Sequence, residues 1–332
     1  MQRIEEIDIL KGIAIFLMVM GHALSFVFKL SELDTYPSDA LFVRNVIYSF
    51  HMPLFFFLSG YVINLKGKEY NFYNNYIIIQ KRFISIALPA LSYIIVYSVL
   101  NGKLMYEWFL PALFLNIVFF CLIKTFFHYL NVGGGKIEIV ATLAIYVAVY
   151  VLIPDSFVSL KWDFKFFIYF YMGSLFFNIK FLDTLKAMKN RCLTELFYTI
   201  SVIIYILSFY FGFMKGVRFQ LGLLTSITGI FICFYLSQYQ NYIPSKLRSF
   251  IIWMGKNTIL IYILHFLIIP SWSSAGDYFV WLAKGNTIKL SIMIQLLYGI
   301  FITLYTILLT GFVGWILSKS KIANLLLFGR KN

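Results

Sequence analysis

Residues Gly12–Phe28 read Gly-Ile-Ala-Ile-Phe-Leu-Met-Val-Met-Gly-His-Ala-Leu-Ser-Phe-Val-Phe, an apolar run whose one ionisable side chain is His22. With the residues just before it, the run reaches the length of about 20 mostly apolar residues that a helix needs to cross a membrane. A cleaved secretory signal has a basic leader, whereas the residues here include Glu5, Glu6 and Asp8. The run therefore predicts a retained membrane-spanning helix.

The composition of the whole chain extends this prediction. Of the 332 residues, 61% are hydrophobic and only 13% are charged, whereas soluble domains have about 45–50% apolar and roughly 25% charged residues. The polar residues are too few to cover so much apolar surface in water. The composition excludes a soluble enzyme, a disordered chain and a fibrous repeat, and it indicates a polytopic membrane protein.

Apolar windows long enough to cross a membrane recur along the chain. They predict ten spans, at residues 9–28, 43–64, 77–99, 107–127, 137–153, 165–179, 195–213, 219–237, 250–270 and 288–317. The predicted fold is an all-α integral membrane protein, a bundle of about ten transmembrane helices. It forms a single domain over residues 1–332 with no separate soluble domain.

The basic residues indicate how the bundle is oriented. The chain has 28 Lys and Arg and 14 Asp and Glu, a formal net charge of +14. With Lys11 set aside because it lies within a span, 18 basic residues fall on the side of the two termini and 9 on the other side. Because cytoplasmic loops are enriched in Lys and Arg, both termini are predicted to be cytoplasmic. The excess positive charge is expected to meet anionic lipid headgroups rather than nucleic acid.

Ionisable side chains inside the spans are candidates for function, because each costs about 2.5–3.5 kcal/mol to insert. In the first span, Asp8 and Lys11 are neighbours on one helical face. Lys11 and His22 are eleven residues apart, or three turns with about 20° left over, so they share a stripe about 16 Å long. The stripe indicates a track with a charged cytoplasmic mouth and an imidazole past mid-membrane. The alternative is a Lys–Asp pair at the interface and a buried histidine bonded to a neighbouring helix.

Two further histidines lie at membrane depth. His51 opens the stretch His-Met-Pro-Leu-Phe-Phe-Phe-Leu-Ser-Gly, in which Pro53 frees a backbone carbonyl and Ser59 permits close packing. His265 follows Tyr262 by three residues, so their polar ends can meet on one helical face. Each has a structural alternative: a packing histidine in a kinked helix, and a bonded Tyr–His pair that joins helices.

A basic pair, Lys81 and Arg82, stands at the cytoplasmic start of the third span, where the alternative role is a topology anchor. The sequence contains no GxSxG, HExxH or P-loop motif and no carboxylate pair deep in a span, and its three cysteines form no CxxC pair. Histidine is therefore the candidate proton-transfer group, which suits general-base chemistry near neutral pH.

Together, these segments resemble the acyltransferase family 3 membrane proteins. The first helix of that family carries a basic residue, ten intervening positions and a histidine, matched here by Lys11 and His22. The segment from His51 resembles the second-helix motif in the His-Met-Pro form of the branch that contains fucose O-acetylases. Three later segments are similar in the same order: Lys81-Arg82-Phe83 with Pro89, Trp108–Leu113, and Tyr262 with His265. Some members carry Arg-x-Arg at the third helix, where this chain has Gln80 before Lys81-Arg82.

The resemblance implies a membrane O-acetyltransferase that uses cytoplasmic acetyl-CoA as acyl donor and no metal. The implied acceptor is a hydroxyl of a cell-surface glycan or of its lipid-linked precursor. His22 is expected to act as general base or to carry the acetyl group itself, while Asp8 holds Lys11. The CoA phosphates are expected at Lys11, Lys81 and Arg82. The expected acceptor-binding residues are His51, Ser59, Trp108, Tyr262 and His265.

A transporter or flippase for a glycan intermediate is the alternative function, since it also needs many helices and buried polar groups. Such proteins often contain inverted repeats, and no internal symmetry is evident in this sequence. Within the family, a peptide or a small molecule is an alternative acceptor. The expected location is the bacterial inner membrane, with membrane lipids and the sugar acceptor as partners and no oligomeric state predicted.

Overall fold

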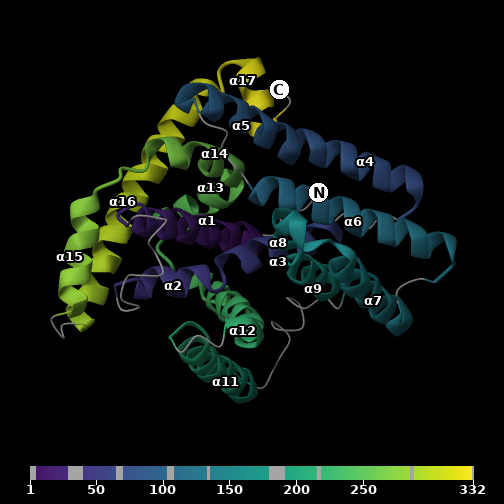
Figure 1. Cartoon of the computed structure of the whole chain (residues 1–332), viewed down its shortest axis with the longest axis horizontal. Helices are drawn as coiled ribbons and strands as arrows, with labels where there is room; N and C mark the ends of the chain where they lie inside the picture. Colours follow the sequence, from purple (N-terminus) through teal and green to yellow (C-terminus); the bar gives the residue numbers. More distant parts are fainter. Residues whose placement is uncertain are drawn as a thin grey trace. The chain divides into compact units, whose positions relative to one another are not determined.

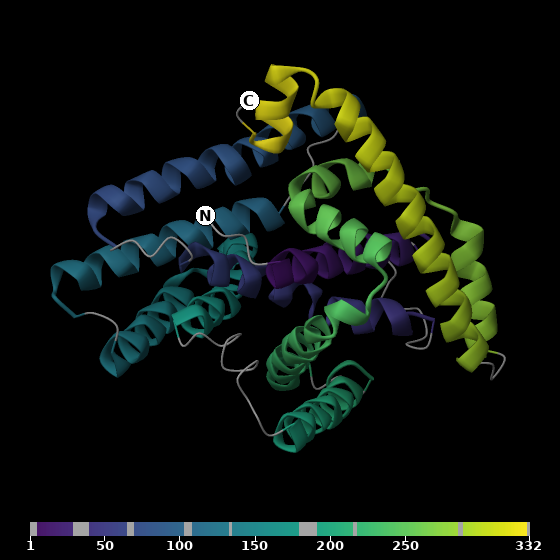
Figure 2. The same ribbon diagram turned by 180° about the vertical axis from the view of Figure 1, so that it is seen from behind.

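The computed structural model describes residues 5–28, 40–64, 70–102, 108–132, 135–178, 191–214, 218–284 and 288–330. All regular secondary structure in these ranges is helical (Figure 1, Figure 2), which confirms the predicted all-α fold. The chain groups into two compact units. Unit 1 comprises Phe56–Thr184 and Ile316–Asn332, and unit 2 comprises Gln2–Phe55 and Leu185–Trp315. The single domain stays a prediction.

Unit 1 contains the larger part of α3 (His51–Ile63), the elements that follow α3 as far as α9, and one late helix. These are α4 (Phe72–Arg82), the π-helix η3 (Phe83–Ala87), α5 (Leu88–Asn101), α6 (Phe109–Tyr129), α7 (Lys136–Leu152), the 3-10 helix η4 (Asp155–Phe157), α8 (Val158–Phe164), α9 (Phe167–Asn178) and the late α17 (Lys321–Phe328).

Unit 2 contains the first helices, the start of α3 and most of the second half of the chain. Its elements are α1 (Glu5–Ser25), α2 (Phe42–Tyr48), α11 (Arg191–Phe209), the π-helix η5 (Tyr210–Met214), α12 (Arg218–Gln238), the 3-10 helix η6 (Gln240–Tyr242), α13 (Ser245–Lys256), α14 (Thr258–Ile268), α15 (Ser273–Lys284) and most of α16 (Ile288–Leu317). The short helices α15 and α17 were not among the predicted spans.

Six helical segments are long and apolar enough to cross a membrane, which supports a multi-pass membrane protein. They are Glu5–Ser25, Phe42–Ile63, Phe72–Val99, Phe109–Tyr129, Glu195–Gly212 and Lys289–Leu317. They match predicted spans one to four, seven and ten. Predicted spans 165–179 and 219–237 correspond to the shorter apolar helices Phe167–Phe177 and Gly222–Gln238, and span 137–153 corresponds to α7.

The count of ten spans and the cytoplasmic termini stay predictions. Several basic residues that determine the predicted sidedness lie outside the described residues: Arg3, Lys29, Lys66, Lys68, Lys103, Lys180, Lys186, Lys189, Lys215 and Lys331.

Predicted span 250–270 corresponds to the helix pair α13 and α14, which together are long and apolar enough for a span but are bent by 88° at their junction. Asn257 stands at the bend. Its side-chain amide donates to the carbonyl of Trp253 at 2.8 Å, and its own carbonyl accepts from the N–H of Ile261 at 3.0 Å. Asn257 therefore ends one helix and begins the next. Apolar composition alone does not reveal such a bend.

Helix α1 is largely buried, and α13 packs along it (Figure 1). Glycines bring the two backbones into contact. A Cβ atom on Gly12 would lie 2.1 Å from the carbonyl oxygen of Ile251, and a Cβ atom on Gly255 would lie 1.8 Å from that of Asp8. Neither glycine can therefore gain a side chain without separating the helices. This contact also sets where α14 begins relative to α1.

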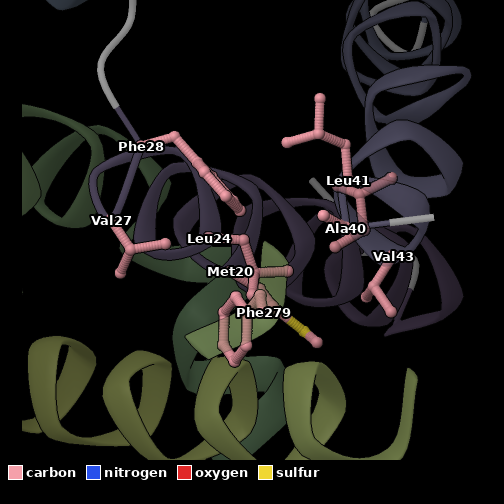
Figure 3. Close-up of a cluster of buried hydrophobic side chains, with 9 residues drawn as sticks. Met20, Leu24, Val27, Phe28, Ala40, Leu41, Val43 and Phe279 are labelled. Atoms are coloured by element: carbon pink, nitrogen blue, oxygen red, sulfur yellow. The ribbon is translucent and has the colours of Figure 1, made fainter. Parts of the chain in front are cut away.

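An apolar cluster anchors the end of α1 to α2 and α15 (Figure 3). Its members are Met20, Leu24, Val27, Phe28, Ala40, Leu41, Val43, Ile47 and Phe279. Because Met20 and Leu24 flank His22 along α1, and Val43 and Ile47 belong to α2, the cluster holds α2 against the histidine-bearing turn of α1.

In unit 1, α6 and α7 are joined by a buried ion pair between Lys124 and Glu138, whose side chains are 11% and 5% exposed. Removing one partner leaves a buried charge without compensation, which costs about 3–5 kcal/mol. We expect Lys124→Met to lower the midpoint of thermal unfolding in detergent, and the double replacement with Glu138→Met to restore most of it. Lys136, exposed on the same helix as Glu138, supplies the control Lys136→Met. Equal midpoints for the two single variants would contradict this role of the pair.

Candidate active site

Unit 2 brings together the three histidines that the sequence places on separate helices. The ring centroid of His22, on α1, is 5.2 Å from that of His265, on α14, and 6.0 Å from that of Tyr48, on α2. The ring of Tyr48 is in turn 5.0 Å from that of His51, at the start of α3. His51 and His265 are 1% and 0% exposed, whereas His22 is partly exposed. We call His22, Tyr48, His51 and His265 the histidine cluster.

His22 lies in a partly apolar setting and has, among the described residues, one hydrogen-bonding partner. Its Nδ1 atom is 3.2 Å from the hydroxyl oxygen of Tyr48, and its ring packs against that of Phe266 with centroids 4.7 Å apart. A half-buried imidazole held at one nitrogen leaves the other nitrogen, Nε2, for proton transfer. The alternative interpretation of His22, a histidine bonded to a neighbouring helix, therefore holds for its Nδ1 atom. The contact at Nδ1 is compatible with a catalytic role of the Nε2 atom.

His265 is fixed in one tautomer by the backbone. Its Nδ1 atom donates to the carbonyl oxygen of Tyr262, and a carbonyl can only accept. In the neutral ring Nε2 is therefore a bare acceptor, and it is buried without a hydrogen-bond partner among the described residues. The rings of Tyr262 and His265 lie on one helical face with centroids 5.6 Å apart, and the hydrogen bond at His265 Nδ1 is to the Tyr262 backbone. The unpaired Nε2 is an acceptor for a donor that a substrate can supply.

His51 is held in the same way, with Nδ1 donating to the carbonyl of Ile47 at 2.8 Å. The carbonyl that Pro53 was predicted to free belongs to Ser49, four residues earlier. The Ser226 hydroxyl, on α12, donates to it at 2.6 Å. Pro53 therefore does more than kink the chain, because the freed carbonyl ties α12 to the segment that carries His51.

Three polar residues at the cluster were missed by the sequence analysis. Arg44 donates from Nε to the Ser25 hydroxyl at 2.9 Å, and its guanidinium lies 4.3 Å from the centre of the Tyr48 ring. Ser25 Oγ is 3.3 Å from the Tyr48 hydroxyl. The count of basic residues includes Arg44 only among the nine on the side away from the termini. Two spacings in the sequence could have indicated these neighbours. Arg44 precedes Tyr48 by four residues, and His22 precedes Ser25 by three, so each pair shares a helical face.

The other predicted residues of α1 lie nearer its beginning. The helix runs without interruption from Glu5 to Ser25, so the angle between Lys11 and His22 is that of a regular helix. Asp8 is 7% exposed and Lys11 is partly buried. Beside them, Glu5 forms an ion pair of 2.9 Å with Arg248 of α13. The uninterrupted helix is what a stripe shared by Lys11 and His22 requires, and the track along it stays a prediction.

The remaining predicted site residues belong to unit 1. Lys81 is exposed and Arg82 is partly buried at the end of α4, directly before the π-helix η3. Ser59 is partly buried within α3, and Trp108 precedes α6 with its ring 5.4 Å from that of Phe166. Their part in the site stays a prediction. Within the described residues, no three His, Cys, Asp or Glu side chains are grouped so as to hold a metal ion.

In a comparison with protein families, the model of acyltransferase family 3, described as an acyltransferase domain, matches residues 4–315. No curated protein and no solved structure is significantly similar to the chain.

Proposed function

Because the chain belongs to acyltransferase family 3 and is a membrane acyltransferase, we propose that it transfers an acetyl group from cytoplasmic acetyl-CoA. The proposed acceptor is a hydroxyl of a cell-surface glycan or of its lipid-linked precursor. The observation that carries the proposal is the histidine cluster, in which a partly exposed imidazole meets Tyr48 and His265 within apolar surroundings. Such a site offers a base in a water-poor setting, as a hydroxyl nucleophile requires.

His22 carries the chemistry in this proposal. Its Nε2 atom accepts the proton of the acceptor hydroxyl, whose oxygen forms a bond to the acyl carbon of the thioester. The carbon–sulfur bond then breaks, and the CoA thiolate takes the proton back from His22. Transfer of the acetyl group through His22 itself is the alternative route. His51, Ser59, Trp108, Tyr262 and His265 bind the acceptor.

The donor approaches from the cytoplasmic end of α1. Lys11, Lys81 and Arg82 bind the CoA phosphates, Asp8 holds Lys11, and the pantetheine arm follows the stripe toward His22. The uninterrupted helix α1 supports such a path of about 16 Å. The His-Met-Pro segment at His51 favours a sugar acceptor through its resemblance to the fucose O-acetylase branch, and the proposed location is the bacterial inner membrane.

Two measurements test this function. Mass spectrometry of surface glycans from cells with and without the protein is expected to show an acetyl group that depends on the protein. The purified protein is expected to unfold at a higher temperature in the presence of CoA, because a ligand that binds the folded state stabilises it. Identical glycans together with an unchanged unfolding temperature would contradict both the donor and the acceptor class.

Lys11→Ala is expected to weaken donor binding and to leave turnover at saturating donor nearly unchanged. A hydrogen bond to a charged group contributes about 1.5–3 kcal/mol, so the apparent KM for acetyl-CoA should rise about ten- to a hundredfold. Lys11→Arg should restore most of the affinity, and Lys284→Ala, at an exposed position of α15, is the control. Loss of turnover with unchanged donor affinity would show that Lys11 belongs to the chemical step instead.

A further inference from the structure

The late helix α17 packs against α5 within unit 1 (Figure 1, Figure 2). At its beginning, the Ser320 side chain accepts a hydrogen bond from the N–H of Ala323 at 3.4 Å. At its end, Phe328 is 3% exposed. The helix lies beyond residues 4–315, which match the acyltransferase domain. It therefore follows the part of the chain that the family shares.

Gly329 ends α17 and brings its backbone into contact with η3. It has the left-handed φ of +61°, and its N–H donates to the carbonyl of Leu325 at 3.0 Å. A Cβ atom on Gly329 would lie 2.5 Å from both the carbonyl oxygen of Ile84 and the Cα atom of Ser85. No Cβ atom fits at such a separation without displacing backbone, so the end of α17 lies directly against the π-helix.

The π-helix η3 directly follows the basic pair Lys81 and Arg82. Its wider turn is closed by the N–H of Leu88, which donates to the carbonyl of Phe83, five residues earlier. Such turns are rare and occur frequently at functional sites. Because Ile84 follows Arg82 by two residues, the contact with α17 lies within one helical turn of the pair that is proposed to bind the CoA phosphates.

Arg330 follows Gly329 directly, so its side chain begins from backbone that lies beside η3. Its N–H donates to the carbonyl of Asn324 at 3.2 Å, which fixes the backbone at this point. The side chain itself is exposed, as is that of Lys81. A long, exposed guanidinium with five N–H donors is therefore placed at the same end of η3 as the basic pair.

The two segments that meet at this contact contribute positive charge without negative charge. Neither segment 72–101 nor segment 316–330 contains Asp or Glu. Their basic residues are Lys81, Arg82, Lys319, Lys321 and Arg330. A surface with charges of one sign attracts ligands of the other sign, and the fork of donors on arginine is suited to phosphate. The contact between α17 and η3 therefore favours a phosphate-bearing ligand.

We propose that α17 belongs to the donor site, where Arg330 joins Lys81 and Arg82 in binding the phosphates of CoA. Gly329 is the positioning residue that holds the end of α17 against η3. The inference rests on the proposed function, in which the basic pair binds the donor. CoA carries phosphates both in its diphosphate and on its ribose, so cations from two separate segments suit it. An anionic lipid headgroup offers the same phosphate chemistry, and the experiment separates the two sources.

Arg330→Gln tests the charge, and because the side chain is exposed, the variant should fold as the wild type does. CoA is titrated against the purified protein in a neutral detergent, and the rise of the unfolding temperature gives the dissociation constant. We expect this constant to increase about three- to thirtyfold. Arg330→Lys should retain most of the affinity, because lysine binds phosphate as a point charge. Lys321→Gln removes the same charge from the exposed beginning of α17, and as the matched control it should stay within about twofold of the wild type.

Gly329→Ala tests the contact with η3. Gly102, the glycine that follows α5, has nearly the same φ of +63°, but a Cβ atom there meets no atom within 4 Å. Gly102→Ala therefore shares the strain of a left-handed alanine without the contact. We expect the dissociation constant of CoA to rise about three- to tenfold in Gly329→Ala but not in Gly102→Ala. Gly329→Ala combined with Arg330→Gln should lose no more affinity than Arg330→Gln, since both act through the same side chain.

Two results would overturn the inference. One is equal affinity of Arg330→Gln and the wild type for CoA. The other is a stabilisation by phosphatidylglycerol that Arg330→Gln loses while its affinity for CoA is unchanged, which would assign this cation to lipid headgroups. If CoA did not stabilise the wild-type protein, the proposed donor itself would be overturned, and with it the proposed function.

Discussion

His22→Ala should abolish acetyl transfer while the protein folds and inserts at wild-type levels. General-base catalysis by a positioned side chain contributes about 10²–10⁴-fold to a rate, and the histidine cluster offers no second imidazole in the same setting. His51 and His265 are almost completely buried, and each spends Nδ1 on a backbone carbonyl. His22 is the partly exposed member of the cluster. Its loss should therefore remove the chemical step rather than weaken it slightly.

The measurement is the acetyl content of surface glycans in cells that carry each variant, normalised to the amount of folded protein in the membrane. His128→Ala is the matched control, because His128 is an exposed histidine at the end of α6. It should retain full acetylation. Acetylation at the wild-type level in His22→Ala cells would eliminate His22 as the base.

Gly255→Ala is the second change with a large expected effect. The new Cβ atom would lie 1.8 Å from the carbonyl oxygen of Asp8, a backbone atom of the crossing helix. Overpacking of a well-packed contact costs about 1–3 kcal/mol and can cost more where backbone must move. Helices α1 and α13 would have to separate, and α14, which follows α13 directly, carries His265. We therefore expect both less folded protein and lower activity per folded molecule.

Gly222→Ala provides the control, because a Cβ atom on Gly222 meets no atom within 4 Å. Alanine in place of glycine within a helix is favourable by about 0.5–1 kcal/mol, so this variant should be as stable as the wild type or more so. Fluorescence-detected size-exclusion chromatography and the thermal midpoint in detergent measure both variants. Wild-type behaviour of Gly255→Ala would mean that α1 and α13 do not touch at this glycine.

The sequence predicts the components of the site better than their arrangement. Helical periodicity is local, so the stripe of Lys11 and His22 follows from counting residues, and α1 is continuous over both. That His51 and His265 would join His22 does not follow from local periodicity. It depends on the bend at Asn257 and on the contact of Gly255 with Asp8. A hydropathy window averages over both features and returns a straight span.

Arg44 shows what a count of basic residues in loops does not reveal. Counting it as an outer-side cation is adequate for topology but gives no information about its contacts. Its place beside Ser25 and Tyr48 arises because the apolar cluster of Figure 3 packs α2 against the end of α1. The signal in the sequence was the face shared by Arg44, Tyr48 and His51, at spacings of four and three residues. A function can be assigned to such a helical face only when the residues that pack against it are known.

The central claim is that the acyl group meets the acceptor at His22. The most direct test is photolabelling of the purified protein with an acyl-CoA that carries a diazirine in its acyl chain, followed by peptide mass spectrometry. Labels should fall on peptides that contain His22, Tyr48 or Phe266, and unlabelled acetyl-CoA should suppress them. Labels that acetyl-CoA suppresses but that lie only on other segments, such as α15 or α17, would contradict the claim.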